Sequence, residues 1–206
     1  MINRELYMEQ ITPFIDKPFV KVITGIRRCG KSVVLRLIRE ELLRRGVSED
    51  HIIYMNFESF EWMDVKALYT YIREVTKVSG KYYILLDEIQ EVTDWEKAVN
   101  AFLVDLDADI YVTGSNSRLL SSEFSTYLAG RYVAFHIMTL SFREYLLFHN
   151  VPLAISASDR KAEFLKYLRM GGFPAIHTAN YDYNAIYKIV YDIYSSVILR
   201  DTVQRH

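Results

Sequence analysis

The residues best suited to chemistry lie between Thr24 and Ser32, which read Thr-Gly-Ile-Arg-Arg-Cys-Gly-Lys-Ser. They match the Gly-x4-Gly-Lys-Ser/Thr phosphate-binding loop at every defined position. Two glycines let the backbone turn where a Cβ would clash, so that successive N–H groups can point at phosphate oxygens. Lys31 would carry a positive charge to the β- and γ-phosphates of a nucleotide, and the Ser32 hydroxyl would bind Mg²⁺. The residues predicted to bind nucleotide are Gly25, Ile26, Arg27, Arg28, Cys29, Gly30, Lys31, Ser32 and Val33.

The segments on either side of this loop are those that phosphate binding requires. The apolar, β-branched run Phe19–Ile23 predicts a buried strand, and the apolar stripe within 31–45 predicts a helix. The N-terminus of that helix would add its positive dipole end to the site. The alternative interpretation, a glycine turn with an exposed lysine, requires neither a strand before it nor a helix after it.

A pair of carboxylates follows a second buried run. The nearly continuous apolar segment Tyr82–Leu86 predicts a strand covered on both faces, and it leads directly into Asp87 and Glu88. In phosphate-loop nucleotidases a carboxylate in this position holds Mg²⁺, which makes Asp87 and Ser32 the predicted metal-binding residues. Glu88 could polarise a water molecule for attack on the γ-phosphate, as a general base. The alternative is an acidic helix start after a buried strand.

A polar cluster follows the predicted strand 109–114. A hydroxyl or amide at this strand tip, Ser115 or Asn116, could hydrogen-bond the γ-phosphate or the attacking water. The alternative is a serine-rich turn that caps the next helix, and both roles are compatible.

The remaining pattern predicts an α/β domain with a helical appendage. Strands are predicted at 51–57 and 132–138, and helices at 3–15, 62–78, 93–103, 118–128, 141–148, 159–170 and 181–206. Thr93 with Glu96, and Ser141 with Glu144, have capping-box spacing.

The loose segment around Pro152 is the best predicted domain boundary. It gives a nucleotide-binding domain over 1–149, a linker over 150–158 and a helical lid over 159–206. In the last helix Tyr183, Tyr187, Tyr191 and Tyr194 fall three or four residues apart, and too little chain remains to cover them. We therefore expect the lid to be truncated, with the natural protein continuing beyond it.

The composition of the chain limits its possible partners and location only in part. The net charge of −1 neither supports nor excludes a nucleic-acid partner. Cys29 is the single cysteine, so that no internal disulfide can form, and a reducing, cytoplasmic compartment is expected. No segment reaches the length of a membrane span or resembles a signal peptide, so we expect no membrane association. The five histidines have no metal-ligand spacing.

Taken together, these motifs resemble the AAA+ ATPases, and more narrowly an archaeal and bacterial group related to the origin-recognition and signal-transducing branches. The resemblance is carried by Gly-Ile-Arg-Arg-Cys-Gly-Lys-Ser at 25–32 (Walker A), Leu-Leu-Asp-Glu-Ile-Gln at 85–90 (Walker B) and Thr-Gly-Ser-Asn-Ser at 113–117. Further matches are Gly-Arg at 130–131, Leu-Ser-Phe-Arg-Glu at 140–144 and Gly-Gly-Phe-Pro at 171–174.

The resemblance implies a P-loop NTPase fold: a five-stranded parallel sheet between helices, with the Asp87 strand beside the Ser115 strand, followed by a partial helical lid. It implies ATP and Mg²⁺ as ligands, Lys31 on phosphate, Glu88 as catalytic base, and Ser115 or Asn116 as first sensor. Arg131 stands where such families place an arginine finger, which would reach the site of a neighbouring subunit and stabilise transition-state charge. The resemblance also implies a C-terminal domain, absent here, that would engage a DNA or protein partner.

Three functions are compatible with these residues. The first is a slow Mg²⁺-dependent ATP hydrolase that acts as a conformational switch for a C-terminal domain or partner. The second is a small-molecule phosphotransferase built on the same loop, and the third is a DNA- or protein-binding module that holds nucleotide with little hydrolysis. The carboxylate pair and the polar strand tip favour water as the phosphate acceptor, and so the first function.

Overall fold

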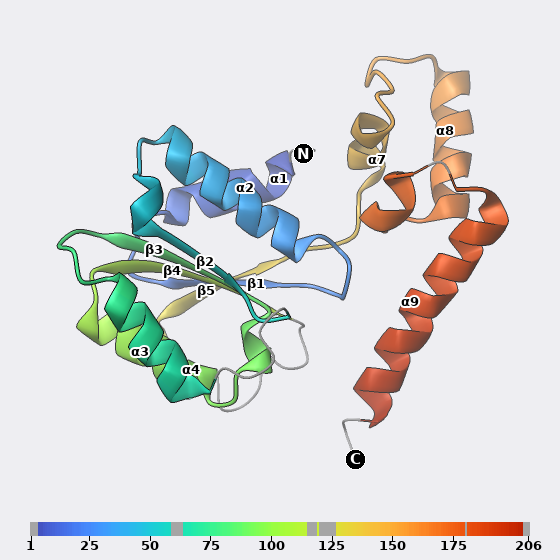
Figure 1. Ribbon diagram of the computed structural model, residues 1–206. Helices are drawn as coiled ribbons and strands as arrows, with labels where there is room; N and C mark the ends of the chain where they lie inside the picture. The colour runs from blue at the N-terminus through green and yellow to red at the C-terminus, as the bar shows by residue number, and fades with distance from the viewer. Residues whose placement is uncertain (1–3, 59–63, 115–118, 120–126, 180, 204–206) are drawn as a thin grey trace. The chain divides into compact units, whose positions relative to one another are not determined.

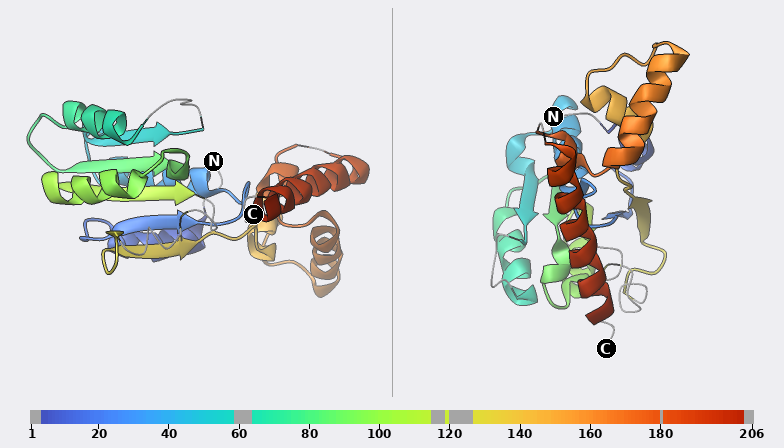
Figure 2. Two further views of the ribbon diagram at one scale, coloured as in Figure 1. Left: turned by 90° about the horizontal axis from the view of Figure 1, so that it is seen from below. Right: turned by 90° about the vertical axis from the view of Figure 1, so that its right-hand side faces the viewer.

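A five-stranded parallel sheet forms the centre of the fold. The computed structural model describes residues 4–58, 64–114, 119, 127–179 and 181–203. The strand order is β2-β3-β4-β1-β5, and all arrows point the same way in Figure 2. The predicted α/β fold is confirmed, and the strand ending at Asp87 lies beside the strand that precedes Ser115. The strands are β1 (Val20–Thr24), β2 (Ile52–Asn56), β3 (Tyr82–Asp87), β4 (Ala108–Gly114) and β5 (Tyr132–His136).

Helices cover both faces of this sheet. α1 (Glu5–Ile11) and α2 (Lys31–Arg44) lie on one face, and α3 (Val65–Val75) and α4 (Trp95–Asp105) lie on the other (Figure 1). Because neither face meets solvent, β3 is buried at all six of its positions, which explains its continuous apolar sequence. Short 3₁₀ helices lie at Thr12–Phe14, Glu49–His51, Ile89–Glu91 and Pro174–His177.

One of the two predicted capping boxes forms. Ser141 caps α7 (Phe142–Phe148) by accepting from the backbone N–H of Glu144, whose carboxylate accepts from the Ser141 N–H in return. The box predicted from Thr93 and Glu96 is wrong, because α4 begins after Asp94, which has a positive φ of 61° and makes no side-chain cap. The helix predicted over 118–128 falls mostly outside the described residues.

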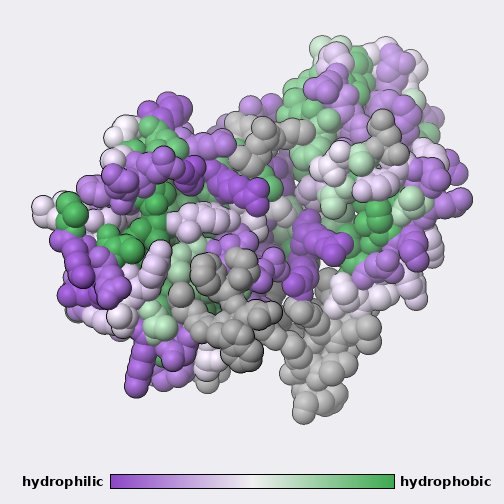
Figure 3. All heavy atoms as spheres, viewed as in Figure 1, coloured by the Kyte–Doolittle hydropathy of each residue, from purple (hydrophilic) through white to green (hydrophobic). Residues whose placement is uncertain are grey.

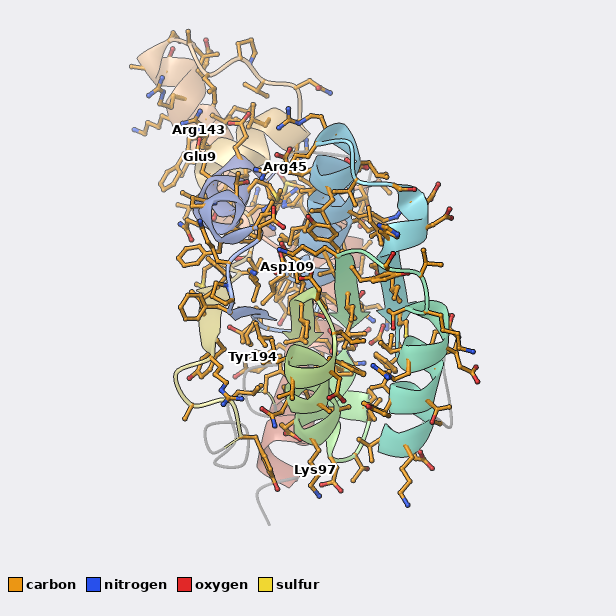
Figure 4. The ribbon with its side chains drawn as sticks, turned by 90° about the vertical axis from the view of Figure 1, so that its left-hand side faces the viewer. Glu9, Arg45, Lys97, Asp109, Arg143 and Tyr194 are labelled. Carbon is orange, nitrogen blue, oxygen red and sulfur yellow. The ribbon has the colours of Figure 1, made fainter. Side chains whose placement is uncertain are left out.

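A buried ionic cluster closes the amino edge of the sheet. The Lys21 ammonium, fully buried in β1, pairs with the Asp109 carboxylate and donates to the Lys17 carbonyl at 2.9 Å. Asp109 also accepts from the Tyr111 hydroxyl and the Asp16 N–H, each at 2.8 Å. Burial lowers the pKa of Lys21, and the charge of Asp109 opposes that shift. Figure 4, which looks onto this edge, shows Asp109 between the two helical layers.

The chain divides into two compact units. The first comprises residues 5–25 and 31–136, and the second comprises Arg4, residues 26–30 and the chain from Ile137 onward. This division falls at His136 and Ile137, before the linker predicted at 150–158. The reason is that the Phe142 ring of α7 packs edge-on against Phe164 and at a tilt against Tyr167 of α8 (Ala157–Met170), which places α7 with the later helices.

The second unit exposes much aromatic surface. α9 (Tyr183–Val203) confirms the long helix predicted at the end of the chain. Its four spaced tyrosines, Tyr183, Tyr187, Tyr191 and Tyr194, are 49–74% exposed, in agreement with the expectation that too little chain remains to cover them. Hydrophobic residues reach the surface of this unit in Figure 3. Among the described residues, no helix has the length and apolar content needed to cross a membrane.

We predict that Asp109→Ala lowers the free energy of unfolding by about 3 kcal/mol or more, because it leaves the Lys21 ammonium buried without its counter-charge. Chemical denaturation measures this loss. Asp107→Ala is the matched control, because Asp107 is exposed two residues earlier, and its cost should stay within about 0.5 kcal/mol. Equal costs for the two variants would contradict the assigned role of the buried pair.

Candidate functional site

Lys31 and Glu88 meet at the carboxyl edge of the sheet. Lys31 is the first residue of α2 and only 4% exposed. Its Nζ lies 3.2 Å from Glu88 Oε1 and donates to the Gly25 carbonyl oxygen at 3.3 Å. The start of α2 and the end of β3 therefore bring together two of the predicted site residues that are far apart in the sequence.

The Asp87 carboxylate is completely buried beside this pair. Three hydroxyl groups donate to it: Ser32 Oγ at 3.1 Å and Thr113 Oγ1 at 2.5 Å to Oδ1, and the Tyr54 hydroxyl at 2.9 Å to Oδ2. Burial, with the nearby Asp87 charge, raises the pKa of Tyr54 to about 12, so the phenol stays a donor at neutral pH. These donors, from α2, β4 and β2, fix the orientation of the carboxylate.

Glu88 is held in an unusual backbone conformation. Its φ of 56° lies in the left-handed region, and its N–H donates to Thr113 Oγ1 at 2.9 Å. Its Oε2 accepts from Gln90 Nε2 at 2.5 Å. A Cβ at Gly114 would lie 2.0 Å from Gln90 Oε1 and 2.7 Å from Leu119, so that any larger residue there would force these side chains to shift. The glycine after Thr113 therefore makes room for the side chain that holds Glu88.

The phosphate-loop residues adopt the backbone conformations that their glycines predicted. Gly25 and Gly30 both have positive φ angles, 154° and 105°. Arg28 between them also has a positive φ of 63° and is exposed, whereas the Cys29 thiol is buried. The Cys29 N–H donates to the Ile26 carbonyl at 3.3 Å, which closes a tight turn.

Arg27 and Val33 are half-buried. Ser115 and Asn116, the predicted first-sensor residues, lie outside the described residues, so their expected role stays a prediction.

Arg131 lies at the opposite edge of the sheet from Lys31. It directly precedes β5, and its backbone carbonyl accepts from the N–H of Val20, the first residue of β1. Its guanidinium donates to Asn100 Oδ1 at 2.9 Å and lines an open cavity of about 520 Å³. Arg131 is therefore not part of the cluster around Lys31 in its own chain.

The donor set around Asp87 fits Mg²⁺. Ser32 and Asp87 offer a hydroxyl and a carboxylate oxygen, the hard ligands that Mg²⁺ prefers, 3.1 Å apart. Across the described part of the chain, no cluster of three or more His, Cys, Asp or Glu residues could hold a metal. Because Mg²⁺ commonly uses one or two protein groups together with substrate phosphates and water, two oxygen donors are enough for such a site.

Sequence reasoning missed Thr113, Tyr54 and Gln90. Thr113 could have been found from the sequence, because it is the last residue with a side chain in the strand next to β3. Tyr54 could not have been found from the sequence, because an aromatic residue inside a predicted strand normally indicates only packing.

We predict that Thr113→Val lowers the free energy of unfolding by about 2 kcal/mol, because the Asp87 carboxylate and the Glu88 N–H each lose a buried partner. Urea denaturation monitored by circular dichroism measures the change. Thr70→Val, at an exposed position on α3, should change stability by less than about 0.5 kcal/mol. A Thr113→Val protein as stable as wild type would show that Asp87 does not depend on this hydroxyl.

Comparison with known proteins agrees with this geometry. Residues 17–146 match a family model described as an AAA domain. An uncharacterised protein of Haemophilus influenzae is 42% identical over all of this chain and 51% of its own length. The uncharacterised protein MJ1544 of Methanocaldococcus jannaschii is 35% identical over all of this chain and 46% of its own length. The chain thus spans about half the length of these relatives.

Solved structures share the fold at low sequence identity. AMPPCP-bound DnaA from Aquifex aeolicus aligns with a TM-score of 0.53 and 14% identity, over 85% of this chain and 58% of that one. A DNA polymerase III gamma subunit-related protein from Thermotoga maritima aligns with a TM-score of 0.52 and 14% identity, over 77% and 57%. The family match over residues 17–146 and the shared P-loop NTPase fold show that this chain belongs to the AAA+ family.

Proposed function

We propose that this chain binds ATP with Mg²⁺ and hydrolyses it slowly, as a nucleotide-driven conformational switch. The observation that carries the proposal is the convergence of Lys31, Ser32, Asp87 and Glu88 at one edge of the sheet. Membership of the AAA+ family supports it, and so does the DnaA neighbour, which was solved with the nucleotide analogue AMPPCP.

The Lys31–Glu88 ion pair would change when a triphosphate binds. Lys31 would exchange its contact with Glu88 Oε1 for the β- and γ-phosphates, whose charge is greater. That exchange would free Oε1, while Gln90 would continue to hold Oε2. Glu88 would then be oriented by one oxygen and open to water at the other.

Glu88 would act as the general base. Its carboxylate would accept a proton as the water oxygen bonds to the γ-phosphorus, and the bond from that phosphorus to the bridging oxygen of ADP would break. Bound Mg²⁺ would neutralise charge on the β- and γ-phosphate oxygens. Ser32 and Asp87 would hold the ion, and Thr113 and Tyr54 would keep Asp87 in place.

Arg131 would serve a neighbouring subunit. Because it lies at the far edge of its own sheet, it could complete a site only in a second copy of the chain, as the predicted arginine finger. A self-associated form would therefore hydrolyse ATP faster than the monomer.

We predict that Glu88→Gln reduces single-turnover ATP hydrolysis about 100-fold or more, which is the usual contribution of a general base. Its affinity for ATP should equal or exceed that of wild type, because Lys31 loses a competing carboxylate. Hydrolysis is measured by phosphate release, and binding by fluorescence of a labelled ATP.

Glu91→Gln is the matched control, because Glu91 is an exposed carboxylate three residues later. It should leave both quantities unchanged. Unaltered hydrolysis in Glu88→Gln would remove Glu88 from the mechanism, and absence of ATP binding by the wild-type protein would refute the proposed function itself.

A further inference from the structure

Arg4 makes a buried three-way contact that the reaction described above does not use. Only 2% of Arg4 is exposed. Its Nε donates to Glu144 Oε1 at 2.5 Å, its Nη1 to the Cys29 carbonyl at 3.0 Å, and its Nη2 to the Met138 carbonyl at 2.9 Å. All four residues belong to the second compact unit. One guanidinium thus joins the phosphate loop, the segment after β5 and the start of α7.

The geometry of this contact is closely determined. Burying a guanidinium is costly unless its charge is paired and its N–H groups are bonded. Glu144 supplies the charge, and its second oxygen accepts from the N–H and hydroxyl of Ser141 at 2.8 and 2.9 Å. The planar fork of arginine matches such fixed acceptors, which the single ammonium of lysine cannot do. Arg4 is therefore held in one orientation.

That orientation also determines the direction of a loop N–H group. The carbonyl of Cys29 and the N–H of Gly30 belong to one planar peptide unit, and no described peptide bond is cis. In a trans peptide these two groups point in opposite directions. Because the carbonyl is turned toward Arg4, the Gly30 N–H is turned away from it. N–H groups of such loops are the ones that contact phosphate oxygens.

Gly30 lies directly beside the Arg4 guanidinium. Its φ of 105° suits glycine, and a Cβ there would lie 3.2 Å from Arg4 Nη1. The guanidinium therefore packs directly against the peptide that it orients, and any larger residue at position 30 would push it away.

We propose that Arg4 is a positioning residue for the nucleotide phosphates: by holding the Cys29 carbonyl, it presents the Gly30 N–H to the phosphate chain. The inference rests on the proposed nucleotide binding. The same guanidinium holds Glu144, so that the peptide between Cys29 and Gly30 is linked to the first turn of α7.

The test compares two variants that break the same ion pair. Arg4→Ala removes the bond to Cys29, whereas Glu144→Ala leaves that bond in place. We expect Arg4→Ala to weaken ATP and ADP binding about tenfold or more, the factor expected for one charge-assisted hydrogen bond, and Glu144→Ala to weaken it less than about threefold. Affinities are measured by titration calorimetry well below each variant's unfolding midpoint.

Two further measurements separate positioning from folding. The amide resonance of Gly30 should shift in Arg4→Ala without nucleotide, and millimolar guanidinium should restore part of the lost affinity.

If Arg4→Ala does not fold, Arg4→Lys replaces it, and it should lose ATP affinity because one ammonium cannot reach all three acceptors. The inference about Arg4 would be wrong, while the proposed function would stand, if wild type and the Arg4 variant bound ATP equally well. The same would follow if the Arg4 and Glu144 variants lost equal affinity for ATP. No binding by wild type would overturn the proposed function and this inference together.

Discussion

The carboxylate of Asp87 is the constraint on which the site depends. A carboxylate without exposure to water must be hydrogen-bonded, or its burial would cost several kcal/mol. Its donors come from the start of α2, from β2 and from the end of β4. Only a sheet whose strands all run the same way brings these termini to one edge. The parallel sheet therefore supplies the hydrogen bonds that the buried Asp87 carboxylate needs. The position of Ser32 beside Asp87 follows from the same arrangement.

The contact between Lys31 and Glu88 has a different character. Asp87 accepts from the neutral hydroxyl groups of Ser32, Tyr54 and Thr113, whereas Lys31 and Glu88 form an ion pair that a polyanion can break. The Glu88 charge offsets part of the desolvation cost of Lys31, which is nearly buried. If the ion pair breaks, only another negative charge can offset that cost. A triphosphate provides that charge. Under the proposed function, exchange of this ion pair for phosphate contacts would give the site two states that such a ligand can distinguish.

Much of this arrangement could be predicted from the sequence. The phosphate loop, the strand ending at Asp87 and the parallel sheet each follow from apolar runs bounded by glycine or acidic residues. The long-range partners could not be predicted in the same way. Arg4 and Glu144 lie 140 residues apart, and nothing local distinguishes either of them from a solvated charge. Asp94 precedes α4 in a left-handed conformation. The start of α4 is therefore set by the tertiary path of the chain and not by the capping-box spacing of Thr93 and Glu96.

The hydrogen bond from Arg4 to the phosphate loop has a physical consequence. Residues 26–30 belong to the unit that contains α7, whereas Lys31, the next residue, begins α2 in the unit that contains the sheet. A ligand shifts a conformational equilibrium only by its difference in affinity for the two states. Phosphate oxygens that bind the Gly30 N–H would favour the peptide orientation that Arg4 holds, and with it the contact from Arg4 to Glu144. Release of those oxygens would remove this preference, so that the first turn of α7 would be linked to phosphate binding through a single guanidinium.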